Sequence, residues 1–392
     1  MPERAPILIA GGGIGGLALA LALARTGRRS VVLEQRDIPT AAGAGIQLGP
    51  NGVRVLRRLG VADALRPLVG EPEALEVGDG PSGSTRALLP LGKWIALRHG
   101  APYWVAHRGD LHAALHGAAA AEPAIALRTG FAVAGLDQAD RSVVARSATG
   151  ERVTGGALVG ADGLWSTIRE MCVDPLPAFA GSTATRTVIP AAMAGRLAVP
   201  NVGLWLSPGA NLVHYPVRGG TEIAAVVIAR EAWQGREWDV EADRSALLAR
   251  LAGFYDSLVG PLSAAPHWRK WALYGLAPLP RWSFGRVTLL GDAAHPMLPH
   301  LAQGGVLALE DAIVLAACLA ARPDDEAEAF RTYETQRRSR ARRVQAASRR
   351  NGRIYHLAPP LAWARNALLR LAPGNLLMAR YDWLYGWRPR PS

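Results

Sequence analysis

The residues best suited to hold a phosphate group lie near the N-terminus, where Gly11-Gly12-Gly13-Ile14-Gly15-Gly16 precedes an acidic residue, Glu34. Gly11 permits a tight turn, Gly13 lets the backbone approach a pyrophosphate, and Gly16 allows a helix to pack closely on a strand. N–H groups at a helix start attract phosphate charge, and a carboxylate at position 34 accepts hydrogen bonds from a ribose. The pattern predicts a dinucleotide site; a plain glycine-rich turn is the alternative.

The segments around these glycines have the order that such a site requires. Residues 6–10 form an apolar run typical of a buried strand, and residues 17–24 form an Ala/Leu stretch typical of a helix, which Gly27 ends. Residues 30–33 are a second apolar strand that leads directly into Glu34. Strand, glycine turn, helix, strand and acid together make up a βαβ unit.

Two more acidic residues follow apolar runs later in the chain. Asp162 comes after the run at 158–160 and precedes a helix that begins near Ser166, although a simple Asp-Gly turn explains it equally. Asp292 comes after the run at 287–290, and a long apolar helix runs from Gly304-Gly305 to Ala321. His295 beside Asp292 is expected to brace that turn rather than to react.

The chain is expected to adopt an α/β fold in which a Rossmann-like nucleotide-binding domain carries an inserted, mostly-β domain, followed by a C-terminal helical segment. Helical periodicity fades between 175 and 280, and runs such as 222–228 resemble sheet. The expected boundaries are 1–70, 101–174 and 281–325 for the nucleotide domain, 71–100 and 175–280 for the β-rich domain, and 326–392 for the helical segment.

Composition narrows the function. The two cysteines exclude a disulfide scaffold and a cysteine-based zinc site, and the histidines have no metal-ligand spacing, so we expect no metal and a cytoplasmic location. No run of about 20 apolar residues suggests a membrane span. Much of the net charge of +12 comes from arginines between 331 and 353. A solvated helix face explains them best, attraction of an anionic ligand comes second, and nucleic-acid binding comes third because no reading motif is present.

Together the three turns resemble the signatures of the single-component flavoprotein aromatic hydroxylases, which have the para-hydroxybenzoate hydroxylase fold. The stretch from Gly43 to Asn51 is similar to the branch of salicylate, 3-hydroxybenzoate and 6-hydroxynicotinate hydroxylases. The resemblance implies bound FAD, transient NADH or NADPH, O2, and a small aromatic substrate that is hydroxylated through a flavin C4a-hydroperoxide. It also implies a monomer or homodimer.

The resemblance assigns residues to the cofactor. Gly11, Gly13 and Gly16 would hold the FAD pyrophosphate and Glu34 the adenosine ribose, while the helix that starts at Gly304 would direct its N-terminal dipole at the flavin. Other residues that the resemblance places at FAD are Gly15, Gln47, Arg108, Asp162, Asp292, Pro299 and Gly305. Asp162 would also serve the passing nicotinamide cofactor.

The candidate catalytic residues are Tyr215, His214 and Gln303. Neighbouring strand residues point to opposite faces, so Tyr215 and His214 cannot both face a substrate from one regular strand. The resemblance favours Tyr215, and a packed sheet histidine is the alternative for His214. Gln303 would contact a substrate hydroxyl or carboxylate. Gln47 occupies a position where the 6-hydroxynicotinate branch has a candidate histidine base, and an amide cannot take that role.

Two other functions remain open from sequence. The first is another flavin reaction on the same fold, such as that of an epoxidase, halogenase or reductase. Halogenases of this fold carry a tunnel lysine, and neither Lys93 nor Lys270 lies in a recognisable motif. The second is a non-catalytic nucleotide sensor, against which the full set of expected flavin contacts argues.

Overall fold

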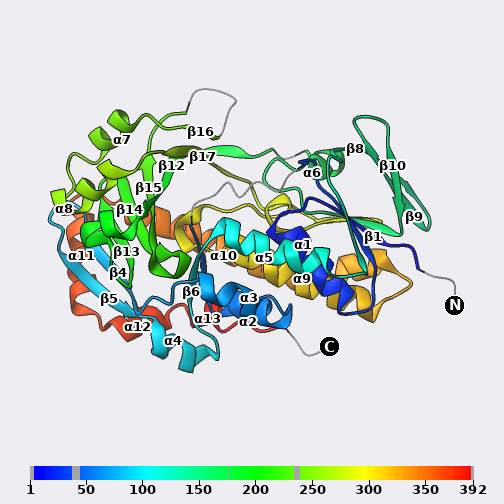
Figure 1. Ribbon diagram of the computed structural model, residues 1–392, viewed down its shortest axis with the longest axis horizontal. Helices are drawn as coiled ribbons and strands as arrows, with labels where there is room; N and C mark the ends of the chain where they lie inside the picture. Colours follow the sequence, from blue (N-terminus) through cyan, green and yellow to red (C-terminus); the bar gives the residue numbers. More distant parts are fainter. Residues whose placement is uncertain (1–3, 38–44, 175, 234–238, 390–392) are drawn as a thin grey trace.

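Two large sheets lie toward opposite ends of an elongated molecule in the computed structural model, which describes residues 4–37, 45–174, 176–233 and 239–389 (Figure 1). The first sheet is parallel apart from one edge strand, and its strands are apolar because both faces are covered. Its order is β18 (Ser283–Phe284), β19 (Val287–Leu289), β11 (Ala157–Gly160), β1 (Ile7–Ala10), β2 (Ser30–Leu33) and β7 (Ile125–Arg128). The glycine turn follows β1, and the turns of Asp162 and Asp292 follow β11 and β19. All three turns therefore lie at the carboxyl ends of neighbouring parallel strands.

Helices with apolar faces cover this sheet. α1 (Ile14–Ala24) packs against α9 (Gly304–Ala321) and α5 (Arg108–Ala120). α9 has the length and apolarity of a membrane span, yet 72% of it is buried inside the protein, as expected of a core helix. The predicted helices at 17–24 and 306–321 are confirmed, each beginning at its glycine turn.

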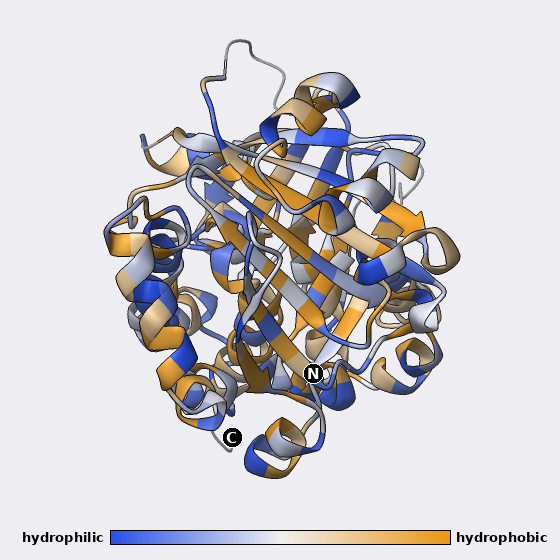
Figure 2. Ribbon diagram, turned by 90° about the vertical axis from the view of Figure 1, so that its left-hand side faces the viewer, coloured by the Kyte–Doolittle hydropathy of each residue, from blue (hydrophilic) through white to orange (hydrophobic). Residues whose placement is uncertain are grey.

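The second sheet has eight strands and one face turned toward the first domain. Its order is β16 (Asp239–Glu241), β17 (Arg269–Gly275), β12 (Ala178–Pro190), β15 (Glu222–Arg230), β14 (Ala210–Val217), β13 (Val202–Ser207), β4 (Ala74–Asp79) and β5 (Thr85–Pro90). Figure 2 looks onto this end and shows hydrophobic residues along several of its strands. The outer face packs on α7 (Arg244–Arg250) and α8 (Asp256–Val259), which leaves the inner face for a site.

Shorter elements lie outside the two large sheets. β3 (Gly45–Leu48) pairs with β6 (Trp104–His107), and β8 (Val133–Ala139), β9 (Ser142–Ser147) and β10 (Arg152–Gly155) form a separate antiparallel sheet. The connecting helices are α2 (Pro50–Arg58), α3 (Ala62–Leu65), α4 (Gly92–His99) and α6 (Thr167–Cys172). The sequence predicted only irregular strands over 71–100 and missed α4, whose apolar residues pack beneath the second sheet rather than along one amphipathic stripe.

The C-terminal region is helical, as expected. α10 (Glu326–Tyr355) is one long helix that runs between the two ends of the molecule, and it is followed by α11 (Leu361–Leu371), α12 (Gly374–Ala379) and α13 (Asp382–Tyr385) (Figure 1). The arginines of α10 do not all lie on a solvated face. Arg337 is 1% exposed and turns inward toward α9, which corrects the sequence interpretation of this segment for that residue.

Candidate active site

The glycine turn is shaped by backbone contacts that a side chain would prevent. Gly11 has φ +108°, a conformation that favours glycine, and a Cβ at Gly16 would lie 2.0 Å from the carbonyl oxygen of Gly11. Gly13 caps the start of α1 and has no atom within 4 Å of the position of a Cβ. The turn thus presents open space and free N–H groups at a helix start, which suits a pyrophosphate.

Glu34 lies at the end of β2, directly beside the glycine turn. Its carboxylate accepts hydrogen bonds from the backbone N–H of Gly12 at 2.8 Å and of Arg36 at 3.0 Å. These bonds orient the carboxylate and leave it further capacity as an acceptor, because a carboxylate has about four lone-pair sites. The position is therefore compatible with the predicted ribose contact.

A cavity of about 300 Å³ lies between the glycine turn, the start of α9 and the inner face of the second sheet. The lining residues that the sequence predicted are Gly13, Gly15, Gln47, Arg108, Tyr215, Asp292, Pro299, Gln303, Gly304 and Gly305. Segments separated by almost 300 residues thus meet in one place. The N-terminal ends of α1 and α9 both face this cavity, and both favour a negatively charged ligand.

Asp292 and Arg108 supply opposite charges on one side of the cavity. Asp292 is exposed to the cavity, and no described residue donates a hydrogen bond to its carboxylate. The surrounding protein raises the pKa of Asp292, and the charges of His295 and Arg108 oppose that shift. A carboxylate with free lone pairs suits the hydroxyl groups of a ribityl chain, and the guanidinium of Arg108 suits the phosphates, so these residues fit FAD.

Asp162 is held by hydrogen bonds within its own turn. Its carboxylate accepts a hydrogen bond from the Ser166 hydroxyl at 2.5 Å and another from the Ile168 N–H at 3.0 Å, while Ser166 caps α6. Both oxygens of Asp162 thus hold the local turn. Its neighbours Ala161 and Gly163, rather than Asp162, line the cavity.

Tyr215 projects from β14 into the cavity, next to a residue that sequence reasoning missed. Arg186 on β12 also lines the cavity, and its register partner Val226 pairs with Val213 on β14, so Arg186, Val213 and Tyr215 share one face of the sheet. Burial raises the pKa of Tyr215 to about 12, although the Arg186 charge opposes this shift. Tyr215 is therefore a neutral hydrogen-bond donor at pH 7.

Arg186 has no carboxylate partner among the described residues. Its guanidinium lies 5.0 Å from the centre of the Trp271 ring, and its buried Nε has no hydrogen-bond partner. Asp239, whose charge acts on Arg186, is already bonded to Arg269 at 2.7 Å. Burial lowers the pKa of Arg186, yet an arginine remains charged at neutral pH. No local sequence pattern marked Arg186, because its lack of a partner is visible only in the fold.

His214 points away from the cavity, and the structure corrects its assignment as a catalytic candidate. Its ring stacks on Trp205 with a centroid distance of 6.4 Å on the outer face of the sheet. Burial lowers the pKa of His214 to about 4, so the ring is neutral. Strand alternation allows only one of the two neighbours to face the cavity, and in β14 that residue is Tyr215.

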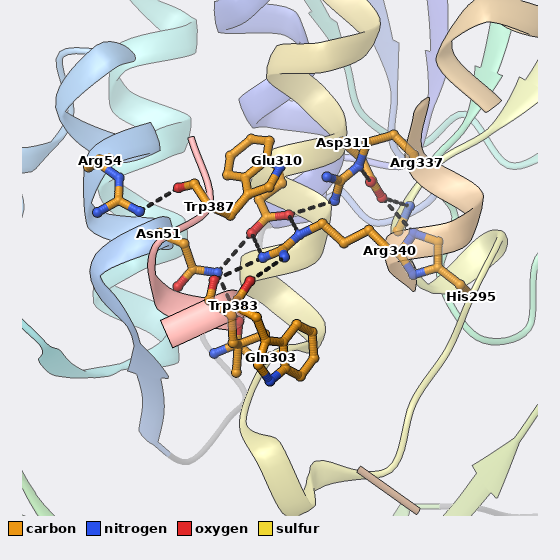
Figure 3. A network of polar contacts seen from close by, with 12 residues as sticks. Asn51, Arg54, His295, Gln303, Glu310, Asp311, Arg337, Arg340, Trp383 and Trp387 are labelled. Carbon is orange, nitrogen blue, oxygen red and sulfur yellow. Dashed lines mark hydrogen bonds and ion pairs between the residues drawn. The ribbon is translucent and has the colours of Figure 1, made fainter. Parts of the chain in front are cut away.

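Gln303 lines the cavity at the N-cap of α9 and is held from behind. The Asn51 amide nitrogen donates to Gln303 Oε1 at 3.0 Å and to Glu310 Oε1 at 2.8 Å (Figure 3). Gln303 is 1% exposed, and its Nε2 has no partner among the described residues. On the other side of the cavity, the Tyr103 hydroxyl donates to Gln47 Oε1 at 2.6 Å.

Behind Gln303 lies a group of buried charged residues, Glu310, Asp311, Arg337 and Arg340, which we call the arginine network (Figure 3). Glu310 binds Arg337 at 2.7 Å and Arg340 at 2.6 and 2.7 Å. Asp311 binds Arg337 at 2.7 Å and His295 at 2.6 Å, and the N–H of Gly291 donates to it at 3.2 Å. His295 thus braces the turn that carries Asp292, as the sequence predicted.

The arginine network also holds the C-terminal segment. Arg340 donates to the carbonyl groups of Trp383 and Leu384 at 3.1 and 3.0 Å. Arg54 on α2 donates to the carbonyl of Tyr385 at 2.5 Å and to that of Trp387. Residues near 385 therefore pack directly behind the cavity wall.

Comparison with known proteins agrees with this geometry. A family model described as an FAD binding domain matches residues 4–348. The chain is 35% identical over 392 residues to 3-hydroxybenzoate 6-hydroxylase of Polaromonas naphthalenivorans, covering 98% of this chain and 97% of that protein. It is 36% identical over 357 residues to 6-hydroxynicotinate 3-monooxygenase of Bordetella bronchiseptica, covering 90% and 92%.

Solved structures agree as well. The crystal structure of Klebsiella pneumoniae HpxO complexed with FAD and uric acid superposes with a TM-score of 0.87 at 25% identity, covering 97% of this chain and 96% of that one. One known fold thus accounts for the dinucleotide turn, the cavity and the eight-stranded sheet. The chain belongs to the FAD-binding-domain family, and it is a flavoprotein monooxygenase of the aromatic hydroxylase class.

Proposed function

We propose that this enzyme hydroxylates a small aromatic acid that carries a ring hydroxyl, a hydroxybenzoate or a hydroxypyridine carboxylate. The observation that carries this proposal is the unpaired guanidinium of Arg186 inside the cavity. A buried charge without a partner is costly, and a bidentate bond to a carboxylate is the pairing to which a guanidinium is best suited. The similarity to hydroxylases named for 3-hydroxybenzoate and 6-hydroxynicotinate supports the same class, because both compounds carry a carboxylate.

The described residues can perform the binding and orienting steps. Bound FAD, reduced by NADH or NADPH, would activate O2 for transfer of one oxygen atom to the ring. Arg186 would bind the carboxylate, and Tyr215 would donate a hydrogen bond to a polar substituent. Val213, Val226 and Ile228 supply apolar walls that exclude water around the ring.

Other contacts follow from the same proposal. Gly13, Glu34, Arg108 and Asp292 would bind FAD, and Pro299, Gly304 and Gly305 would lie along the flavin. We propose that the first sheet and its helices form the FAD domain and the eight-stranded sheet forms the roof over the substrate. We further propose a cytoplasmic enzyme, monomeric or homodimeric, in keeping with its free cysteines Cys172 and Cys318.

The test uses the purified, flavin-loaded enzyme. We expect 3-hydroxybenzoate to accelerate oxidation of NADH or NADPH and to yield a product heavier by one oxygen atom. Arg186→Met should weaken 3-hydroxybenzoate binding about 10- to 100-fold, since a charge-assisted hydrogen bond contributes roughly 1.5–3 kcal/mol. Binding of phenol, which lacks the carboxylate, should change little.

The matched control is Arg152→Met, which removes an exposed arginine from β10, far from the cavity. It should leave the binding of both ligands unchanged. Equal loss of 3-hydroxybenzoate and phenol binding in Arg186→Met would contradict the assignment of the carboxylate site. No stimulation by any hydroxylated benzoate or pyridine carboxylate would contradict the proposed substrate class.

A further inference from the structure

We propose that Glu310 and Asn51 are positioning residues that fix the amide of Gln303 with its N–H group, and not its carbonyl, facing the substrate. The three residues form what we call the amide relay (Figure 3). The inference rests on the proposed function and deepens it. It specifies that the substrate atom at Gln303 is a hydrogen-bond acceptor, namely the ring oxygen in its ionised form.

The relay begins at Glu310, whose oxygens are bound by arginine side chains. The side chain is fully buried and accepts three hydrogen bonds from the guanidinium groups of Arg337 and Arg340, at 2.6 to 2.7 Å. A guanidinium group can only donate, so both oxygens of Glu310 act as acceptors.

The charge of Glu310 determines how the next amide is oriented. A carboxylate cannot donate, so the atom of Asn51 that lies 2.8 Å from Glu310 Oε1 must be the NH2 group. That NH2 group has a second hydrogen, which is donated to Gln303 at 3.0 Å. The reverse orientation would place the Asn51 carbonyl oxygen against a negative charge.

The orientation is passed on to Gln303 by the same reasoning. Since Asn51 donates, the atom of Gln303 that faces it must be Oε1, and Nε2 is the end of the amide turned away from Asn51, in a residue that lines the cavity. Nε2 is buried and has no partner among the described residues, which is the state of a donor that awaits a ligand. A buried carboxylate thus sets the hydrogen-bond polarity of a cavity residue through two amides.

The proposed consequence is chemical. A fixed donor stabilises an ionised ring oxygen over a hydroxyl, so the pKa of the bound phenol falls although Gln303 takes up no proton. The substrate releases its proton to water as it binds. Gln47, whose amide cannot act as a base, then needs no basic replacement. Other groups that influence this ionisation are Tyr215, Arg186, Arg108 and Asp292, which face the cavity from the sheet and the two turns.

The experiment compares two probes on the oxidised, FAD-loaded enzyme. 3-Hydroxybenzoate offers an acceptor once ionised, whereas 3-aminobenzoate offers a donor at the same ring position. Dissociation constants come from the change in flavin absorbance, and the pKa of the bound phenol comes from its ultraviolet difference spectrum against pH. Asn51→Asp replaces the donor by an acceptor, which would draw the Gln303 NH2 group back and turn Oε1 to the cavity.

We expect wild-type enzyme to prefer 3-hydroxybenzoate and Asn51→Asp to reduce that preference by about tenfold or more, the equivalent of roughly 1.4 kcal/mol. The pKa of the bound phenol should rise by about one unit. Asn375→Asp, the same change at an exposed position on α12, should alter neither quantity. A merely structural role for Asn51 would lower stability without moving the phenol pKa.

A second variant covers the case in which Asn51→Asp does not fold. Gln303→Glu keeps the oxygen that accepts from Asn51 and replaces the cavity donor by an acceptor, so it should shift the probe preference and the phenol pKa in the same directions. If either variant folds, binds both probes as tightly as the wild-type enzyme does and keeps the same preference for 3-hydroxybenzoate over 3-aminobenzoate, the relay is overturned and the proposed substrate class is not. Wild-type enzyme that binds neither probe, and that no hydroxylated benzoate or pyridine carboxylate stimulates, would overturn the relay together with the proposed substrate class.

Discussion

Behind the first turns of α9, every oxygen of the two buried carboxylates Glu310 and Asp311 has a hydrogen-bond partner. In front of the same turns, Arg186 and the Gln303 amide keep buried nitrogen atoms without partners. Both regions bury polar groups in one protein, but the protein itself bonds every oxygen of these two carboxylates, whereas it leaves the two cavity residues with unpaired nitrogen atoms. The comparison separates polar groups that hold the structure from polar groups that bind a ligand.

The largest expected effect tests the satisfied side. Asp311→Asn removes the carboxylate that pairs with His295 and one of the two carboxylates that pair with Arg337, and breaking such a buried pair costs about 3–5 kcal/mol. Urea unfolding measures this loss in the free energy of unfolding. Glu328→Gln, which breaks an exposed pair with Arg331 on α10, should cost no more than about 1 kcal/mol. If Asp311→Asn and Glu328→Gln lowered the free energy of unfolding equally, the arginine network would stabilise the protein no more than a surface ion pair does.

The next effect concerns how the free energy of unfolding depends on pH. Asp311 behind α9 and Asp292 in the cavity should affect this dependence with opposite signs. Burial favours a raised pKa, but the charges of His295 and Arg337 lower the pKa of Asp311 to about 2. Its stabilisation is therefore present above pH 4, amounts to about 2 kcal/mol, and is lost as the pH falls toward 2. The pKa of Asp292 is raised, so Asp292 lowers stability as the pH rises above its unfolded value.

These two contributions can be separated by unfolding curves between pH 2 and 7. Relative to wild type, Asp292→Asn should unfold with a higher free energy at pH 7 and an equal one at pH 3. Asp311→Asn should show its deficit at pH 7 and approach wild type at the acid end. The same sign of difference in both variants would contradict the assignment.

Flavin binding tests the unsatisfied side directly. Asp292→Ala removes a carboxylate that no described residue bonds, so the apoenzyme should be no less stable than wild type at pH 7 while FAD affinity falls about 10- to 100-fold. The ratio of absorbance at 450 nm to that at 280 nm after purification reports the loss. A variant that purifies with full flavin content would show that Asp292 does not contact FAD.

The smallest effect concerns Tyr215. Its hydroxyl is a neutral donor in the cavity, so Tyr215→Phe should change the free energy of unfolding by less than about 1 kcal/mol. It should nevertheless raise the share of O2 that is released as hydrogen peroxide instead of entering product. Oxygen and peroxide electrodes used on one sample measure that share. Unchanged coupling would place the substrate elsewhere in the cavity.

The sequence was informative where local pattern and local structure coincide. The glycine turn, the apolar strands of the first sheet and the helix from Gly304 to Ala321 are specified by neighbouring residues, and they were predicted correctly. Strand alternation showed that Tyr215 and His214 face opposite sides of the sheet, and the family resemblance favoured Tyr215. These features depend on backbone geometry within about 20 residues, which a single sequence displays.

The remaining features depend on partners that are distant in sequence. Arg337 was counted with the solvated arginines of its helix, but it pairs with Asp311 at a separation of 26 residues. Arg186 could not be identified as a site residue from the sequence, because what marks it is the lack of a carboxylate partner in the folded protein. Asn51 marked only the start of a helix in the sequence, and its contact with Gln303 spans 252 residues.

The clamp of Arg54 on the carbonyl of Trp387 joins residues separated by 333 positions. At the usual synthesis rates of about 5–20 residues per second, roughly 20–70 seconds pass between translation of the first partner and of the second. The nucleotide turn near residue 11 is therefore made long before the segment that closes the wall behind Gln303. During that interval the nascent chain carries the nucleotide turn but lacks the C-terminal segment that packs behind Gln303.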